Sequence, residues 1–281
     1  MGGSNPTPYG YTVSLSIFVV PLVLIAIWHA RHPERHFHRR ALLWSAATIA
    51  VAGSVLDLAF GADFFTFGNA GATLNWRLPG WSWAGMTFVP SYLPVEEFAF
   101  YVFGGLFVVS VYSWADCEWV RAYDSEHYGR ALADRPALLR ISWTAVVLWM
   151  IVLSGALAWR ASTTHEAGFP GYFVFLMVLT ILPTVLFVRT LRRFVNWRAF
   201  AFTYTALLLV SLVWEVTLAI PYEWWNYQPA HMLGVSIRAW GHLPLEAVLV
   251  WLVITWDGVL AFEFFRVFWH FDTSVRKAVL G

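Results

Sequence analysis

Charged residues are scarce in this 281-residue chain, where Asp, Glu, Lys and Arg together make up only 12%. Soluble domains carry about twice that share. Here 59% of the residues are hydrophobic and the mean hydropathy is +0.60, which predicts a membrane protein that crosses the bilayer several times. The net charge of +1 gives no indication of a nucleic-acid partner.

The sequence also lacks the motifs of several cofactor and metal sites, which limits the reactions that the protein can catalyse. The single cysteine, Cys117, excludes an internal disulfide and a site built from several thiolates. The sequence has no G-x-G turn for a dinucleotide and no D-D-x-x-D cluster of the kind that holds magnesium pyrophosphate. The only tight histidine group is His32, His36 and His38, whereas a di-iron hydroxylase needs several such groups. We therefore expect neither a cofactor nor a metal.

Seven apolar runs are each about 20 residues long, which is the length that a helix needs to cross a bilayer. The fold is therefore predicted to be all-α. The runs cover residues 11–30, 41–60, 93–113, 142–159, 171–188, 199–220 and 243–264. No basic segment precedes the first run, so we expect it to be a retained span and not a cleaved signal peptide. The connection 61–92 is too long to be structureless, and part of it, 80–92, is predicted to re-enter the membrane or lie along its surface.

The basic residues predict the orientation. Fifteen of the 18 fall in the 30s loop, in 116–141, in 189–198 or in the C-terminal tail, and the others are Arg77, Arg160 and Arg238. By the positive-inside rule the N-terminus is outside the cell membrane and the C-terminus is cytoplasmic. The stretch 116–141 mixes charges of both signs and is predicted to be a solvated cytoplasmic helix.

The second half of the chain resembles the first. Asp57 and Glu215 are 158 residues apart, as are Arg40 and Arg198, and Pro21 and Pro183 fall at matching places in their spans. We therefore predict a three-helix repeat in 1–115, a cytoplasmic connector and a linker span in 116–165, and a second three-helix repeat in 166–281. The linker span lets both repeats insert in parallel.

Acids recur at the repeated positions. Glu96 and Glu97 open the run after Leu93-Pro94, and Glu246 opens the run after Leu243-Pro244. Acids inside apolar spans are costly, so function is the default interpretation. Two carboxyl groups in one pocket supply an acid and a base, although capping of a helix start is the structural alternative. The candidate catalytic residues are Asp57, Glu96, Glu97, Glu215 and Glu246.

Two further acids have structural interpretations. Asp257 has no acidic counterpart in the first repeat, where Phe107 stands, and is expected to hydrogen-bond between helices. Glu263 is expected to pair with Arg266. Aromatic residues form 19% of the chain and either belong to interfacial belts or surround a cationic intermediate. The candidates for substrate binding flank the acids and are Trp81, Trp83, Trp225, Tyr227 and Trp240.

Together these features resemble the membrane lycopene cyclases of the heterodimeric and fused type. The resemblance rests on the duplicated three-helix unit, the acids Asp57 and Glu215, the Trp225-Asn226-Tyr227 loop and the Leu-Pro-x-Glu openings, and covers about 11–114 and 171–266. It implies a cofactor-independent isomerase of carotenoid biosynthesis, which protonates the end of an acyclic polyene dissolved in the bilayer. Glu96 or Glu246 is then the expected acid and Glu97 the partner or base, with Asp57 and Glu215 orienting them.

The sequence departs from the family pattern at Ala247, where a second Glu is expected. One repeat alone then supplies the proton relay, or the substrate is a modified or different polyprenyl chain. Two alternatives stay open. One is a hydratase or another polyprenyl cyclase that uses the same acids. The other is a non-catalytic transporter or carotenoid-binding protein, since parallel repeats and intramembrane acids also suit transport.

Overall fold

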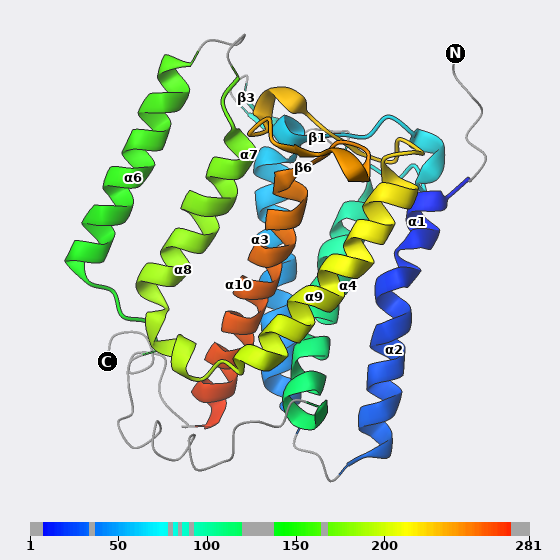
Figure 1. Ribbon diagram of the computed structural model, residues 1–281, viewed down its shortest axis with the longest axis vertical. Coiled ribbons are helices and arrows are strands. Elements are labelled where there is room, and N and C mark those ends of the chain that lie inside the picture. The colour runs from blue at the N-terminus through cyan, green and yellow to red at the C-terminus, as the bar shows by residue number, and fades with distance from the viewer. Residues whose placement is uncertain are drawn as a thin grey trace.

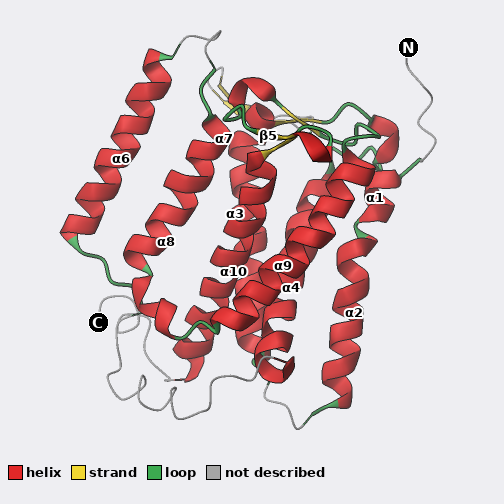
Figure 2. Cartoon of the chain, in the orientation of Figure 1, coloured by secondary structure: helices red, strands yellow, loops and turns green. Residues whose placement is uncertain are grey.

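The computed structural model describes residues 8–33, 37–77, 81–83, 86–89, 93–119, 138–163 and 168–270. In these ranges the chain is mainly helical, as predicted (Figures 1 and 2). The long helices are α2 (Ser16–Arg31), α3 (Arg39–Phe64), α4 (Val95–Trp114), α6 (Trp143–Ser162), α9 (Trp197–Trp214) and α10 (Leu245–His270). The short helix α1 (Gly10–Ser14) leads into α2, and the π-helical turns η2 (Ala115–Trp119) and η5 (Glu215–Ala219) extend α4 and α9.

Six helical segments are long and apolar enough to cross a membrane, and each overlaps a predicted span. They are Gly10–Arg31, Arg39–Gly61, Val95–Cys117, Trp143–Ser162, Trp197–Ala219 and Leu245–Trp269. Polar side chains start two of the helices: Ser142 accepts the Ala145 N–H at 3.2 Å, and Asn196 accepts the Arg198 and Ala199 N–H groups, both at 3.2 Å.

The seventh predicted span, 171–188, corresponds to a shorter apolar stretch, Gly171–Phe187. It consists of α7 (Gly171–Val174), the π-helical segment η3 (Phe175–Ile181) and α8 (Leu182–Phe187). Pro183 lies at the start of α8, where it has no N–H to donate and its ring crowds the carbonyl four residues earlier. This local loss of regular hydrogen bonding accounts for the widened turn before it.

Helices α4 and α10 lie at the centre of the bundle. α4 packs against α2, α3 and α9, and α10 packs against α3, α4, α9 and η3. Glycines permit the closest approaches: a Cβ on Gly258 would lie 2.9 Å from Val108 and 3.1 Å from Ile49, and one on Gly105 would lie 3.3 Å from Ile49. By contrast, α6 has no buried residue and stands at the edge of the bundle (Figure 1).

Short antiparallel strand pairs cover one end of the bundle (Figure 1). β1 (Phe65–Thr66) pairs with β4 (Asn226–Tyr227), and β5 (Ser236–Ile237) pairs with β6 (Leu243–Pro244). In the predicted re-entrant stretch 80–92, only a hairpin is described, in which β2 (Trp81–Trp83) pairs with β3 (Met86–Val89). The rest of that stretch lies outside the described residues. Three 3-10 turns, η1 (Ala70–Ala72), η6 (Pro229–His231) and η7 (Arg238–Trp240), complete this layer.

A buried ionic cluster holds the opposite end together, beside the 3-10 turn η4 (Arg189–Arg193). Arg266 contacts Glu263 and Asp116, each at 2.7 Å, which confirms the predicted pairing of Glu263 with Arg266. Tyr112 donates to Glu263 at 2.6 Å, and Asn196 donates to Asp116 at 2.9 Å. Of the predicted cytoplasmic helix 116–141, the structure describes only 116–119 and 138–141.

Candidate active site

Glu97 lies in the first turn of α4, beside the start of the first span. Pro94, in an extended conformation, ends the preceding loop, so that both Glu96 and Glu97 fall in this first turn. Tyr11 of α1 donates a hydrogen bond of 2.5 Å to Glu97 Oε1. Both side chains are buried, and the sequence analysis did not identify Tyr11.

Glu215 begins the π-helical turn η5 at the end of α9. Its two carboxylate oxygens accept hydrogen bonds from different elements: Tyr227 of β4 donates to Oε2 at 2.7 Å, and Trp251 of α10 donates to Oε1 at 2.8 Å. Single π turns inside α-helices are frequent at functional sites. Two donors on one carboxyl suit its ionised form, which is an acceptor only.

Glu97 and Glu215 line the same cavity, although they come from different halves of the chain. The cavity encloses about 70 Å³. Its remaining wall is almost entirely aromatic and includes Tyr11, Phe65, Phe67, Phe100, Tyr101, Tyr172, Trp214, Trp225, Tyr227 and Trp251. We call this space the acid cavity. Two carboxyl groups and a set of ring faces are what protonation of an alkene and stabilisation of a cation require.

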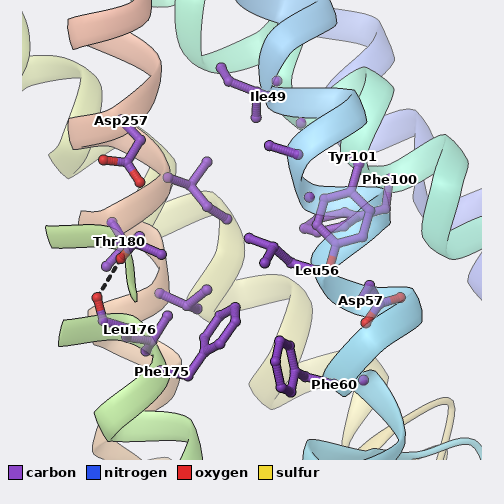
Figure 3. A pocket seen from close by; sticks show the side chains of 18 of the residues that line it. Ile49, Leu56, Asp57, Phe60, Phe100, Tyr101, Phe175, Leu176, Thr180 and Asp257 are labelled. Atoms are coloured by element: carbon purple, nitrogen blue, oxygen red, sulfur yellow. Dashed lines mark hydrogen bonds between the residues drawn. The ribbon is translucent and has the colours of Figure 1, made fainter. Parts of the chain in front are cut away.

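Asp57 belongs to a larger, adjoining cavity of about 180 Å³, which we call the apolar cavity (Figure 3). Tyr101 of α4 lines the same cavity as Asp57. Two glycines of α3 make room for this pair: a Cβ on Gly53 would lie 2.3 Å from the Tyr101 ring, and one on Gly61 would lie 2.3 Å from Asp57 Oδ1. Tyr101, Tyr172 and Trp251 line both cavities, so the two spaces are adjacent.

Tyr172 lies between the acids of both halves. It is buried in α7 and is near enough to interact electrostatically with Glu215, Asp57, Glu246 and Glu97. Tyr227 is outside the membrane-spanning segments. Its burial, and then the neighbouring Glu215, raise its pKa well above the usual 10 of a phenol. Tyr227 therefore remains a neutral hydrogen-bond donor at physiological pH.

Glu96 and Glu246 occupy equivalent positions away from the acid cavity. Glu96 Oε1 accepts the Leu74 N–H and the Thr12 hydroxyl, both at 2.6 Å, and Glu246 Oε1 accepts the Leu233 N–H at 2.5 Å. Both side chains are almost fully buried. Neither residue lines the acid cavity or the apolar cavity. Each one fastens the loop that precedes its own helix, so that the structure favours anchoring for the two residues that the sequence suggested as acids.

The aromatic residues that were predicted to bind substrate do not all line the acid cavity. Trp225 and Tyr227 line the acid cavity. Trp240, in η7, is 39% exposed and is not part of the wall of either cavity. The side chains of Trp81 and Trp83 lie outside the described part of the structure. Tyr101 and Trp251 were not predicted, but they are 150 residues apart, as are Glu96 and Glu246, so the repeat itself was a signal for them.

Among the described residues, no group of three or more His, Cys, Asp or Glu side chains is placed to hold a metal ion. In comparisons with known proteins, no family model, no curated protein and no solved structure matches the chain. The acids and the aromatic wall of the acid cavity are therefore the features that indicate a function.

Proposed function

We propose that this protein is a membrane-embedded, cofactor-independent cyclase that closes a ring at the end of an acyclic carotenoid of the lycopene type. The observation that carries the proposal is that Glu97 and Glu215 face one aromatic cavity, which adjoins a larger apolar cavity. An apolar polyene fits such a space, and two carboxyl groups supply the proton and remove it again.

The chemistry balances without an oxidant or a reductant. A carboxylic acid protonates the terminal carbon–carbon double bond, which leaves a tertiary cation. An internal double bond attacks this cation and forms the carbon–carbon bond of a six-membered ring. A carboxylate then removes a proton from a carbon next to the new cation, which gives the ring its double bond. The product is an isomer of the substrate, and the surrounding ring faces stabilise the cation.

The contacts favour one division of roles. Glu97 is the acid for two reasons. The Tyr11 hydroxyl is the one donor to it that the described residues show, and the carboxyl groups of Asp57 and Glu96 lie near it. Glu215 is the base, because Tyr227 and Trp251 hold both its oxygens as acceptors. Asp57 lies in the wall of the apolar cavity with Tyr101, and Glu96 and Glu246 act as loop anchors. This assignment replaces the expectation that Glu96 or Glu246 protonates the substrate.

We further propose two parallel three-helix repeats joined by the linker span α6, with Gly171–Phe187 as a seventh span. A matched pair of contacts supports this arrangement. Glu96 accepts the Leu74 N–H as Glu246 accepts the Leu233 N–H. The distribution of arginine favours an outside N-terminus and a cytoplasmic C-terminus, which puts the acid cavity near the outer surface.

The test is expression in a bacterium that accumulates lycopene, followed by analysis of the pigments for rings. The wild type is expected to form a cyclic carotene, and Glu97→Gln and Glu215→Gln are expected to leave lycopene unchanged. Glu223→Gln is the matched control, because Glu223 is exposed in a loop. Unchanged lycopene with well-inserted wild-type protein would contradict the proposal and favour binding or transport, and an added hydroxyl would favour a hydratase.

A further inference from the structure

Asp257 is an acid inside the bundle that ring formation does not use. It lies on α10 and lines the apolar cavity together with Phe60, Leu56 and Trp251. Its side chain is partly buried. Its Oδ1 atom is enclosed and has no hydrogen-bond partner among the described residues. A carboxyl oxygen without a partner inside a membrane bundle is costly, so a contact between helices does not account for Asp257.

The wall beside Asp257 also offers an acceptor. Thr180 belongs to η3, which packs against α10, and Figure 3 shows Thr180 and Asp257 at the same end of the cavity. The Thr180 hydroxyl donates its proton to the Leu176 carbonyl, so its oxygen can still accept a hydrogen bond from a ligand. The π-helical geometry of η3 falls where this segment lines the cavity, as is frequent at functional sites.

The apolar cavity extends from Asp257 to the acid cavity. Trp251, which donates to Glu215, lines both spaces. Asp257 is six residues further along α10, or about 9 Å at the rise of an α-helix. A single elongated ligand can therefore place one part between Glu97 and Glu215 and another part beside Asp257.

We propose that the apolar cavity binds an acyclic isoprenoid that carries a hydroxyl group, and that Asp257 and Thr180 hold this hydroxyl. The isoprenoid nature of the ligand rests on the proposed cyclase function, whereas the hydroxyl is inferred from the unpaired Asp257 Oδ1 and the nearby Thr180 hydroxyl at one end of a mainly apolar wall. Asp257 is then a specificity-determining residue that selects an isoprenoid alcohol over the hydrocarbon of the same chain.

The experiment measures binding to the purified protein in lipid nanodiscs. Labelled geranylgeraniol is competed with unlabelled geranylgeraniol and with the tetraene hydrocarbon that lacks its hydroxyl. The wild type is expected to prefer the alcohol by about tenfold, because one hydrogen bond to an otherwise unpaired carboxyl oxygen is at stake. Asp257→Leu is expected to lose this preference and still bind the hydrocarbon, which also shows that the variant is folded. Asp63→Asn is the matched control, because Asp63 lines a neighbouring cavity beside α6.

Equal affinity of the wild type for the two probes would overturn the inference, and so would a preference that survives in Asp257→Leu. The readout does not depend on ring formation. A hydroxyl preference that requires Asp257 supports the inference even if no cyclic carotene forms, and a cyclase without this preference refutes the inference alone.

Discussion

Glu97 at the start of α4 and Glu215 at the end of α9 face one cavity, and each is held by an aromatic donor from another helix or strand. Because the two acids come from different halves of the chain, the acid cavity forms only when both halves pack together. Ala247, which stands where a counterpart of Glu97 is expected, is fully buried and packs with Leu212 and Leu243. The protein therefore has one acid pair in place of two equivalent ones.

The first prediction concerns Gly61. A Cβ at this position would lie 2.3 Å from Asp57 Oδ1, so Gly61→Ala displaces this carboxyl in the wall of the apolar cavity. Misplaced groups in an active site cost up to about a hundredfold in rate, and we expect ring formation to fall about tenfold or more, measured as cyclic product per unit of inserted protein. Gly155→Ala is the control, because a Cβ there meets no atom within 4 Å, and equal loss in both variants would refute the explanation.

The second prediction concerns pH and Tyr227. The unfolded chain releases the phenol proton near pH 10, whereas the raised pKa of Tyr227 keeps the proton in the folded protein. Unfolding is therefore favoured as the pH rises above about 10. The melting temperature in detergent is expected to fall more steeply with alkaline pH in the wild type than in Tyr227→Phe. Parallel curves for the two proteins would show that Tyr227 titrates normally.

The third prediction concerns the ionic cluster at the end away from the acids. Arg266→Met removes the cation that contacts both Glu263 and Asp116. Breaking a buried pair in this way destabilises by about 3–5 kcal/mol, which lowers the melting temperature. Arg266→Met combined with Glu263→Met is expected to recover part of the loss, because Glu263, the more deeply buried of the two carboxylates beside the missing cation, is then also removed. A double variant less stable than the single one contradicts this account.

The fourth prediction concerns orientation. A green fluorescent protein fused to the C-terminus is expected to fluoresce, and an alkaline phosphatase fused there is expected to be inactive, because the positive-inside rule predicts a cytoplasmic C-terminus. Fusions within the loop that carries β5 are expected to give the reverse pattern, provided that the fusion inserts stably. Matching signals from the C-terminus and this loop would contradict α10 as a span between them.

Much of the fold could be predicted from the sequence, because the bilayer requires long apolar helices and six of them stand out by composition alone. The seventh was predicted as a full span, but the π-helical turn before Pro183 depends on local hydrogen bonding that hydropathy does not report. The sequence predicted five candidate acids, of which Glu97 and Glu215 line the acid cavity and Asp57 lines the apolar cavity. The hydrogen bonds from the Leu74 and Leu233 N–H groups to Glu96 and Glu246 could not be predicted, because the path of these loops cannot be derived from composition.

The aromatic residues were harder to predict, because rings are frequent throughout the chain and their roles depend on tertiary contacts. Tyr11 lies in a different span from Glu97 and has no sequence motif around it. Trp225 and Tyr227 were predicted because they belong to an aromatic loop between two spans that carry acids, and both line the acid cavity. Tyr101 and Trp251 also line it and are separated by the same 150 residues as Glu96 and Glu246, so the repeat pattern carried information on them.

The most direct measurement is the deuterium content of the product formed from lycopene by membranes of the expressing strain in D₂O. Acid-initiated cyclisation through Glu97 predicts a single deuterium and no oxygen added for each ring, and no labelled product with Glu97→Gln. Rings that form without deuterium, or an acyclic product that has gained water, would contradict the account.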